Sequence, residues 1–390
     1  MSQSIVTTGR SRICIVQPVQ SPYWTLRLQS LAAFKNLDLS LLLERASFGH
    51  RPDWTPRLID GVKVEVVGSS VFSSICKRGD LGYEIQTLRS IPWRMTATLW
   101  RNRPDVVVLC NATQLLFALP VKWFRGSRIA ITVEDTVHAA RNLGFLTRHL
   151  KAWVYRRADC WFAFSEDAKE YLSRIGIVNG VYRSSWSLDM QYFRPRRLEE
   201  RKTGQGDVGV LRTALFIGRL SQAKGVMHLL EAWRGLEPET RQACRLKLVG
   251  DGPLAAAIKR YVVVHGLENV ECLGHIPYDQ VQQLLSSSDL FVLPTLQDLF
   301  SLTVVEAMAS GCAVITTPFN GARELVEPEK SGWIVDPSVP HALIEVLEKA
   351  LSPETDLSSM GLAARARVEH MDNAKVMAEF ARLLLKLANR

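Results

Sequence analysis

The sequence predicts an α/β protein made of two domains, each built on a parallel β-sheet. Strand-like apolar runs alternate with helical patterns along the chain, which is typical of parallel α/β sheets. The length of 390 residues points the same way, because single cores usually divide beyond roughly 250–300 residues. A polar, charged stretch at 194–207 separates two sets of strand-like runs. We therefore place a first domain at 1–195, a linker at 196–212 and a second domain at 213–368.

Apolar runs of strand length define the elements of both domains. The end of the chain differs, because apolar residues such as Phe380 and Leu384 recur there at helical spacing. Residues 369–390 are therefore expected to form an amphipathic helix packed on a core. The predicted strands are Arg12–Gln17, Leu39–Leu43, Val62–Val67, Asp105–Cys110, Arg128–Val133 and Cys160–Ser165 in the first domain, and Thr213–Gly218, Arg245–Gly250, Val270–Leu273, Leu290–Pro294 and Ala313–Thr317 in the second.

The composition excludes several classes of protein. Hydrophobic residues make up 47% and charged residues 22%, so the bulk of the chain is not disordered. The seven cysteines are scattered and form no Cys-x-x-Cys pair, which argues against a disulfide framework or a zinc site. The N-terminus lacks the apolar core of a signal peptide, and no apolar stretch approaches the ~20 residues of a membrane span. We expect a cytoplasmic protein, or one peripheral to the inner face of a membrane.

The first candidate binding segment lies where the predicted strand ending at Ile217 meets a loop and a helix. Gly218 at the strand end allows a ligand to approach the backbone closely. Arg219 and Lys224, five residues apart, can converge on one anion, and the helix that follows adds its N-terminal dipole. These features suit a diphosphate. The alternative is a solvated arginine and lysine on an ordinary loop.

A second glycine-containing turn follows the next predicted strand. Gly250-Asp251-Gly252-Pro253 matches the weak G-x-G-x-x-A pattern of dinucleotide-binding proteins. A dehydrogenase would place an acidic residue ~20 positions further on, and Glu268 and Glu271 lie near that spacing. The turn nevertheless follows the second strand of its domain, not the first. A tight strand-to-helix turn in any nucleotide-binding sheet needs the same glycines, and we favour that interpretation.

The third segment carries two carboxylates beside a predicted helix N-terminus. Asp298 lies in the loop after the strand Leu290–Pro294, and Glu306 lies about a turn into the helix that Gly311 ends. Carboxylates so placed can accept hydrogen bonds from vicinal hydroxyls of two sugars. The free amide groups near Ser301, Leu302 and Thr303 can face an anion between those sugars. The alternative is a surface aspartate and a glutamate that only caps the helix.

Residues 213–337 resemble the donor half of glycosyltransferase family 4, a family of retaining enzymes. The resemblance rests on four stretches in this order: Gly218-Arg219-Leu220 with Lys224-Gly225, Gly250-Asp251-Gly252-Pro253, residues 298–311, and Ser331-Gly332 with Asp336-Pro337. It implies the GT-B fold, in which two Rossmann-like domains face each other across a cleft. It also implies that the C-terminal helix packs back on the N-terminal, acceptor-binding domain.

The same resemblance implies roles for individual residues. Arg219 and Lys224 bind the donor diphosphate, and Glu306 binds the nucleotide ribose. Asp298 lies near the donor sugar, where the family usually has glutamate. Arg219, Lys224 and Asp298 are thus the catalytic candidates of this half. Nucleotide binding is assigned to Gly218, Arg219, Lys224, Gly250, Gly252, Leu302, Thr303 and Glu306.

The first half matches the family less closely. Its usual glycine-rich loop after the first strand is replaced by Gln17–Trp24, and its His-Asp pair by Glu134-Asp135. His138, three residues on, is the catalytic candidate of this half, although a lone histidine near a helix start is more often a cap or a surface residue. The chain has no Asp-x-Asp motif and no cluster with metal-ligand spacing, so we expect no metal and no cofactor.

The predicted function is transfer of a hexose-type sugar from a UDP- or GDP-linked donor to a glycan or lipid-linked acceptor. Such a reaction serves the synthesis of cell-surface polysaccharide or glycolipid. Two alternatives share the fold: a sugar-nucleotide epimerase or phosphorylase, and a non-catalytic homologue that only binds nucleotide sugars. The presence of Arg219, Lys224 and Glu306 together argues against the non-catalytic homologue.

The excess of positive over negative charge is confined to the first half. Residues 1–200 carry 28 Lys and Arg against 17 Asp and Glu, whereas residues 201–390 carry 20 against 22. Many of these cations lie beside aromatic residues, as in Lys122-Trp123-Phe124-Arg125 and in 148–157. Trp and Tyr favour the membrane–water boundary, and cations favour an anionic surface. We expect peripheral association with an anionic membrane. The alternatives are core tryptophans with a solvated basic face, and nucleic acid, for which no recognised binding module is present.

Overall fold

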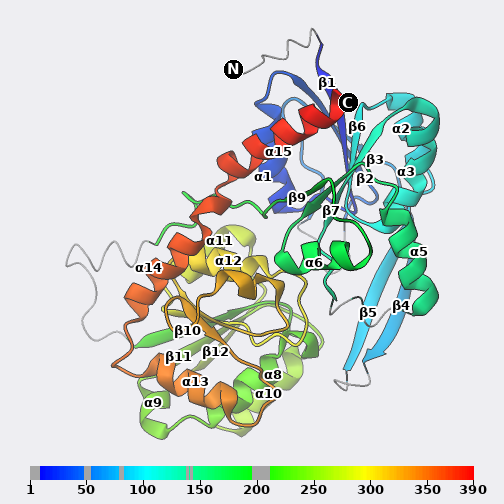
Figure 1. The fold of residues 1–390 in the computed structure, drawn as a ribbon. Helices are drawn as coiled ribbons and strands as arrows, with labels where there is room; N and C mark the ends of the chain where they lie inside the picture. Colours follow the sequence, from blue (N-terminus) through cyan, green and yellow to red (C-terminus); the bar gives the residue numbers. More distant parts are fainter. Residues whose placement is uncertain (1–8, 48–53, 79–82, 138–139, 141–143, 196–210) are drawn as a thin grey trace. The chain divides into compact units, whose positions relative to one another are not determined.

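The computed structural model describes residues 9–47, 54–78, 83–137, 140, 144–195 and 211–390. The chain divides into two compact units, one of residues Met1–Ser187 with Asn373–Arg390 and the other of Leu188–Asp372. The predicted linker at 196–212 lies almost entirely outside the described residues. Figure 1 shows both units, and each is described below by itself.

Unit 1 is built on a seven-stranded parallel sheet in the order β3-β2-β1-β6-β7-β8-β9. The chain lays down β1, β2 and β3 in one direction and then returns to place β6 beside β1. A separate antiparallel ribbon, β4 with β5, joins β3 to the second half. The strands are β1 Ser11–Gln17, β2 Leu37–Leu43, β3 Val62–Val66, β4 Ser70–Arg78, β5 Tyr83–Ile91, β6 Val106–Leu109, β7 Arg128–Val133, β8 Cys160–Ala163 and β9 Val181–Arg183.

Helices cover both faces of this sheet because its central strands are apolar on both sides. Cys14 and Val16 of β1 belong to a core that includes residues of α2, α3 and α5, and the alternate residues Ile13 and Ile15 are equally buried. Helix α15 packs with α1 and contacts β1 and β6, as expected for the C-terminal helix. The helices are α1 Pro22–Ala32, α2 Met95–Asn102, α3 Ala112–Arg125, α5 Phe145–Tyr155, α6 Glu166–Arg174 and α15 Asn373–Ala388.

Unit 2 repeats the same principle with six parallel strands in the order β12-β11-β10-β13-β14-β15. Here β10 and β13 are neighbours, although β11 and β12 lie between them in the sequence. The strands are β10 Arg212–Ile217, β11 Cys244–Val249, β12 Val270–Gly274, β13 Leu290–Val292, β14 Ala313–Thr316 and β15 Gly332–Ile334. The helices are α8 Val226–Arg234, α9 Pro238–Gln242, α10 Ala255–Val264, α11 Tyr278–Ser286, α12 Leu302–Ala309, α13 Ala342–Leu351 and α14 Leu357–Val368, with short 3-10 turns at Gln222–Lys224, Gly321–Leu325 and Glu369–Met371.

Helix α12 is buried over most of its length. Its residues from Val304 to Ala309 are all buried, and it contacts α11, α14 and β14. Arg365 of α14 holds its C-terminal end by donating to the carbonyl of Ala309. The same guanidinium donates to the carbonyls of Phe193 at 2.7 Å and Met190 at 3.1 Å. Arg365 thus fixes the segment that enters unit 2 against α12.

No helix among the described residues combines the length and the apolar character that crossing a membrane requires.

Candidate functional site

The candidate site lies at the carboxyl edge of the unit 2 sheet, between β10 and β13. The chain leaves β10 toward β11 on one side and leaves β13 toward β14 on the other, so the order of strands reverses between β10 and β13. Ligands of open α/β sheets bind at such points, just beyond the strand ends. The loops concerned are 218–225 after β10, 293–301 after β13 and 317–320 after β14.

Two glycines after β11 shape the first of these loops. Gly250 has φ +135°, and a Cβ there would lie 1.9 Å from the carbonyl oxygen of Gly218. A Cβ at Gly252 would lie 2.5 Å from the carbonyl oxygen of Leu220. The amide of Leu220 also donates to the carbonyl of Asp251 at 2.9 Å. Close backbone packing explains these glycines, and their predicted contact with a nucleotide stays a prediction.

The dehydrogenase interpretation is not supported by the position of its proposed ribose acid. Glu268 precedes β12, and Glu271 lies within it, level with Lys247 of β11, so neither lies at the carboxyl edge. The carboxylate of Glu271 forms an ion pair with Arg245 at 3.3 Å. The glycine-rich turn therefore belongs to the packing of the β10 loop.

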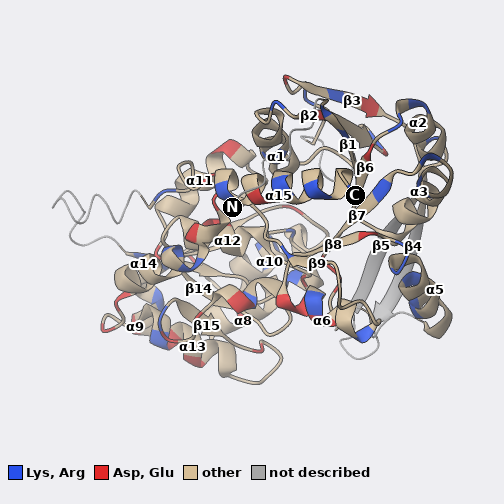
Figure 2. Cartoon of the chain, turned by 45° about the horizontal axis from the view of Figure 1, so that its top comes forward, with Lys and Arg blue, Asp and Glu red and all other residues tan. Residues whose placement is uncertain are grey.

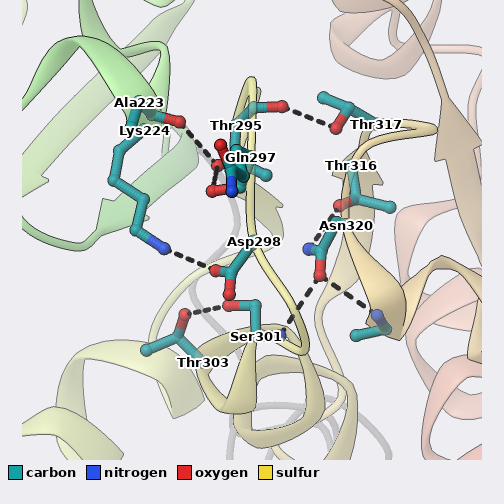
Figure 3. A network of polar contacts seen from close by, with 11 residues as sticks. Ala223, Lys224, Thr295, Gln297, Asp298, Ser301, Thr303, Thr316, Thr317 and Asn320 are labelled. Carbon is teal, nitrogen blue, oxygen red and sulfur yellow. Dashed lines mark hydrogen bonds and ion pairs between the residues drawn. The ribbon is translucent and has the colours of Figure 1, made fainter. Parts of the chain in front are cut away.

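The loops after β10 and β13 are fastened together through the carbonyl of Ala223, whose contact with Thr295 Figure 3 shows. The carbonyl of Ala223 accepts from the amide of Leu296 at 2.8 Å and from the hydroxyl of Thr295 at 2.7 Å. Gly225 has φ +67°, and a Cβ at this position would lie 1.8 Å from the carbonyl oxygen of Pro294. Only glycine permits this approach, so Gly225 allows the two loops to touch.

Asn320 links the β13 loop to the β14 loop. Its side-chain oxygen accepts from the amides of Ser301 at 3.2 Å and Ala322 at 3.1 Å, and its amide group donates to the hydroxyl of Thr316 at 2.9 Å. The amide of Asp298 donates to the carbonyl of Phe319 at 3.0 Å. The backbone that carries Asp298 is thus fixed on both sides. Asn320 was not among the predicted site residues, since nothing in its sequence context distinguishes it from an ordinary turn residue.

Lys224 and Asp298 meet across the reversal point. The ammonium of Lys224 lies 2.5 Å from Oδ2 of Asp298, and both side chains are largely buried, with 25% and 16% of their surface exposed. They come from loops that follow different strands, 74 positions apart in sequence. The structure therefore brings together two of the residues that the sequence predicts for one site.

Arg219 adds a second cation to the β10 loop. Its side chain is exposed, and its guanidinium has no hydrogen-bond or ion-pair partner among the residues that the structure describes. Gly218, beside it, is half-buried at the end of β10. Arg219 therefore remains available to an anion, whereas Lys224 is already paired with Asp298.

The N-terminus of α12 lies in the same group of loops. Ser301 provides no side-chain cap for this helix, and Leu302 and Thr303 in its first turn are half-buried. The expectation of a free amide at Ser301 is wrong, because that amide donates to Asn320. The amides of the first helical turn have no partner within the helix, and their contact with an anion stays a prediction.

Glu306 lies one turn further into α12 and is fully buried. Its Oε1 accepts a hydrogen bond from the hydroxyl of Tyr278, the first residue of α11, at 2.8 Å. Burying a carboxylate is costly unless it is hydrogen-bonded, and Tyr278 supplies a donor. Sequence patterns did not identify Tyr278, because it lies 28 positions from Glu306 and belongs to no motif.

In unit 1, the catalytic candidate His138 lies outside the described residues. The neighbouring Asp135 is engaged within the unit: Oδ1 pairs with Lys151 at 2.6 Å, and Oδ2 accepts from the hydroxyl of Tyr155 at 2.6 Å. Burial, reinforced by this carboxylate, raises the pKa of Tyr155 well above its usual value, so the phenol stays a donor. Asp135 thus holds helix α5 to the end of β7.

Side chains close the loop after β1, where the family resemblance implies a glycine-rich turn. Gln20 is buried and holds the backbone of Arg57, accepting from its amide at 2.8 Å and donating to its carbonyl at 3.2 Å. Ser21 caps α1 by accepting from the amide of Trp24. This loop is therefore fixed by side-chain hydrogen bonds, without a glycine-rich turn.

Among the described residues, no group of three or more His, Cys, Asp or Glu side chains is arranged to hold a metal ion. That transfer needs no metal or cofactor stays a prediction.

Two family models match the chain. The one described as "Glycosyl transferases group 1" covers residues 205–367, which include the whole candidate site, and the one described as "Glycosyl transferase 4-like domain" covers residues 40–183. The chain belongs to the group 1 glycosyl transferases. The family resemblance inferred from the motifs is therefore confirmed.

Several curated proteins are similar to this group 1 glycosyl transferase. A candidate colanic acid biosynthesis glycosyltransferase of Escherichia coli is 31% identical over 60% of this chain and 58% of its own length, and an amylovoran biosynthesis glycosyltransferase of Erwinia amylovora is 31% identical over 45% and 44%. The chain thus spans about half the length of these relatives. A GDP-mannose-dependent alpha-mannosyltransferase of Mycolicibacterium smegmatis is 29% identical over 72% of this chain and 71% of its own.

Solved structures show that the fold is GT-B. Anabaena HepE in complex with UDP has a TM-score of 0.73 at 16% identity, covering 96% of this chain and all of its own. A sucrose-phosphate synthase of Thermosynechococcus elongatus has a TM-score of 0.76 at 18% identity, covering 97% and 99%. The predicted fold class is confirmed.

The contact at Gly225 gives a test of how the site is built. We expect Gly225→Ala to lower the free energy of unfolding by about 1–3 kcal/mol more than Gly266→Ala, because overpacking costs about that much. Both glycines have positive φ, +67° and +58°, but a Cβ at Gly266 would meet no atom within 4 Å. Urea denaturation of the two variants measures the difference. Equal losses would show that the approach of the two loops is not needed.

Proposed function

We propose that the protein is a retaining glycosyltransferase that moves a hexose-type sugar from a UDP- or GDP-linked donor to a glycan or lipid-linked acceptor. The observation that carries the proposal is the meeting of Arg219, the Lys224–Asp298 pair and the first turn of α12 at one reversal point, with Glu306 one helical turn away. Cations and helix amides suit a diphosphate, and carboxylates suit sugar hydroxyls.

In the proposed reaction, the bond between the donor C1 and the diphosphate oxygen breaks, and the diphosphate leaves with the bonding electrons. Arg219, Lys224 and the amides of Leu302 and Thr303 stabilise the charge that develops on it. A lysine ammonium has three N–H donors, so Lys224 can keep Asp298 and still donate to phosphate oxygens. The acceptor hydroxyl forms the new bond to C1 and gives its proton to the departing diphosphate oxygen, with retention of configuration. We propose that these cations serve without a bound metal.

The relatives support the donor and the pathway. One similar structure holds UDP, and one similar enzyme is named for GDP-mannose. Two relatives are named for colanic acid and amylovoran biosynthesis. We infer that this protein likewise serves the synthesis of a cell-surface polysaccharide or glycolipid.

The two cations should be essential for turnover. We expect Arg219→Ala or Lys224→Ala to lower turnover by about 100–1,000-fold while the protein stays folded, because a lost contact to developing charge costs about that much. The assay follows release of nucleoside diphosphate from UDP- and GDP-hexoses in the presence and absence of lipid-linked sugars. Lys330→Ala is the matched control, because Lys330 is exposed and precedes β15 at the opposite edge of the sheet. Normal turnover in either site variant would refute the diphosphate role.

Glu306 should contribute to nucleotide affinity through its charge. The change Glu306→Gln keeps the shape of the side chain and removes the charge. A charge-assisted hydrogen bond is worth about 1.5–3 kcal/mol, so nucleotide affinity should fall at least about tenfold. Calorimetry with UDP and GDP measures it. An unchanged dissociation constant would reject contact with the ribose.

We further propose that unit 1 docks on the cytoplasmic face of an anionic membrane, where a lipid-linked acceptor would be held. Helices α2, α3 and α5 are neighbours and lie along one side of unit 1 in Figure 1. The alternative in which these tryptophans are core residues does not hold for Trp93, Trp100, Trp123 and Trp153, which are exposed. Large apolar residues exposed on these helices and just before α2 are Trp93, Trp100, Leu116, Trp123, Phe124, Phe145, Leu146, Leu150 and Trp153.

Cations accompany these aromatic residues, as the blue segments of α3 and α5 in Figure 2 show. The guanidinium of Arg125 lies 4.2 Å from the ring centre of Trp100, and that of Arg157 lies 4.4 Å from that of Trp153. Not every cation is available, because Lys122 is paired with Asp159 inside the unit. Exposed aromatics interleaved with arginine suit an anionic bilayer surface.

Vesicle binding tests this surface. The full chain should sediment with phosphatidylglycerol vesicles at low salt, but not with phosphatidylcholine vesicles, and salt should weaken binding. The double variant Phe124→Ser, Leu146→Ser should bind less, because these residues are 74% and 82% exposed. Val263→Ser in α10, where the valine is 79% exposed, is the matched control. Protein that stays in the supernatant with anionic vesicles at low salt would contradict membrane docking.

A further inference from the structure

The carboxylate to which we assign the ribose is covered by a side chain that no motif includes. Glu306 has no exposed surface, and every residue of α12 that follows Thr303 is also buried. Tyr278, whose hydroxyl donates to Oε1 of Glu306 at 2.8 Å, is 36% exposed. A fully buried carboxylate cannot receive a ligand hydroxyl until a neighbour moves. Tyr278 both bonds the carboxylate and reaches solvent.

The chemistry of the contact resembles that of the ligand. A phenol hydroxyl donates one hydrogen bond to a carboxylate oxygen, as a ribose hydroxyl does. An unpartnered buried carboxylate is strongly unfavourable, so a donor on Oε1 stabilises the nucleotide-free protein. If a ribose hydroxyl replaces the phenol, Oε1 keeps a donor throughout.

The surroundings of Tyr278 hold its helix and leave its side chain at the surface. Its ring meets the buried ring of Phe193 edge to face, with centroids 6.3 Å apart. The hydroxyl of Tyr192 donates to the carbonyl of Asp279 at 2.8 Å, which fixes the start of α11. Arg365 in turn fixes the carbonyl of Phe193. A rotation of the Tyr278 side chain toward solvent therefore leaves these backbone contacts in place.

Building on the proposed function, we propose that Tyr278 is a positioning residue whose hydroxyl occupies the ribose position on Glu306 and is exchanged for a ribose hydroxyl when the donor nucleotide binds. A ligand without ribose hydroxyls cannot complete the exchange. Tyr278 thereby keeps the buried carboxylate hydrogen-bonded before the nucleotide arrives, and its displacement lowers the affinity for ribonucleotides alone.

The test is calorimetry on the full chain with UDP and GDP and with their 2′,3′-dideoxy forms. In Tyr278→Phe the ring remains and no hydroxyl needs to be displaced. We expect the dissociation constant for the ribonucleotide to fall by about three- to tenfold, and that for the dideoxynucleotide to stay unchanged. In the Glu306→Gln background, adding Tyr278→Phe should cause a much smaller gain. Tyr182→Phe removes a tyrosine hydroxyl on β9 of unit 1 and should leave all affinities unchanged.

Two failures can be told apart. Unchanged or weaker ribonucleotide binding by Tyr278→Phe, beside a wild-type protein that binds it, overturns the exchange and leaves the proposed function standing. An equal gain for the dideoxynucleotide overturns it too, because the effect then does not involve the ribose. If neither wild type nor variant binds UDP or GDP at millimolar concentration, the proposed function fails and the exchange fails with it.

Discussion

The contact between Gly225 and the carbonyl of Pro294 is the constraint on which the candidate site depends. Strands β10 and β13 are neighbours, so the loops that leave them must pass within van der Waals distance. A side chain at Gly225 would prevent it. Lys224 stands between this glycine and Ala223, whose carbonyl is held by the opposite loop. These backbone contacts therefore position Lys224. Its ion pair with Asp298 is a further contact between the same two loops.

Three charged groups of this site already have partners within the chain. Lys224 is bonded to Asp298, and Glu306 to Tyr278, whereas Arg219 is exposed. A nucleotide sugar that enters must exchange such partners as well as add new ones. Replacing one hydrogen bond by another yields little net free energy. The affinity for the nucleotide sugar should therefore depend on how well its own groups replace the partners that they displace. We therefore expect the displaced contacts to limit how tightly the nucleotide sugar is held.

The sequence predicted the parallel sheets, because buried strands and tight glycine turns have local signatures. It also identified Lys224, Asp298 and Glu306, whose motif reflects a fixed strand-loop-helix spacing. It did not predict Tyr278, because only the fold brings that residue to α12. The β4–β5 ribbon was missed for a different reason: the apolar residues of β4 occur in adjacent pairs, Val71-Phe72 and Ile75-Cys76, rather than in alternation.

Unit 1 shows that two sheets with the same kind of strand reversal need not carry the same kind of site. Its sheet has the same reversal, between β1 and β6, yet Gln20 and Ser21 close the first loop and Asp135 is paired with Lys151.

The claim that nucleotide chemistry belongs to unit 2 is tested most directly by a crystal structure of the full chain with bound UDP or GDP. We predict a diphosphate within hydrogen-bond distance of Arg219, Lys224 and the first amides of α12, with the ribose on Glu306. A nucleotide bound elsewhere, or a ribose turned away from Glu306, would contradict the account.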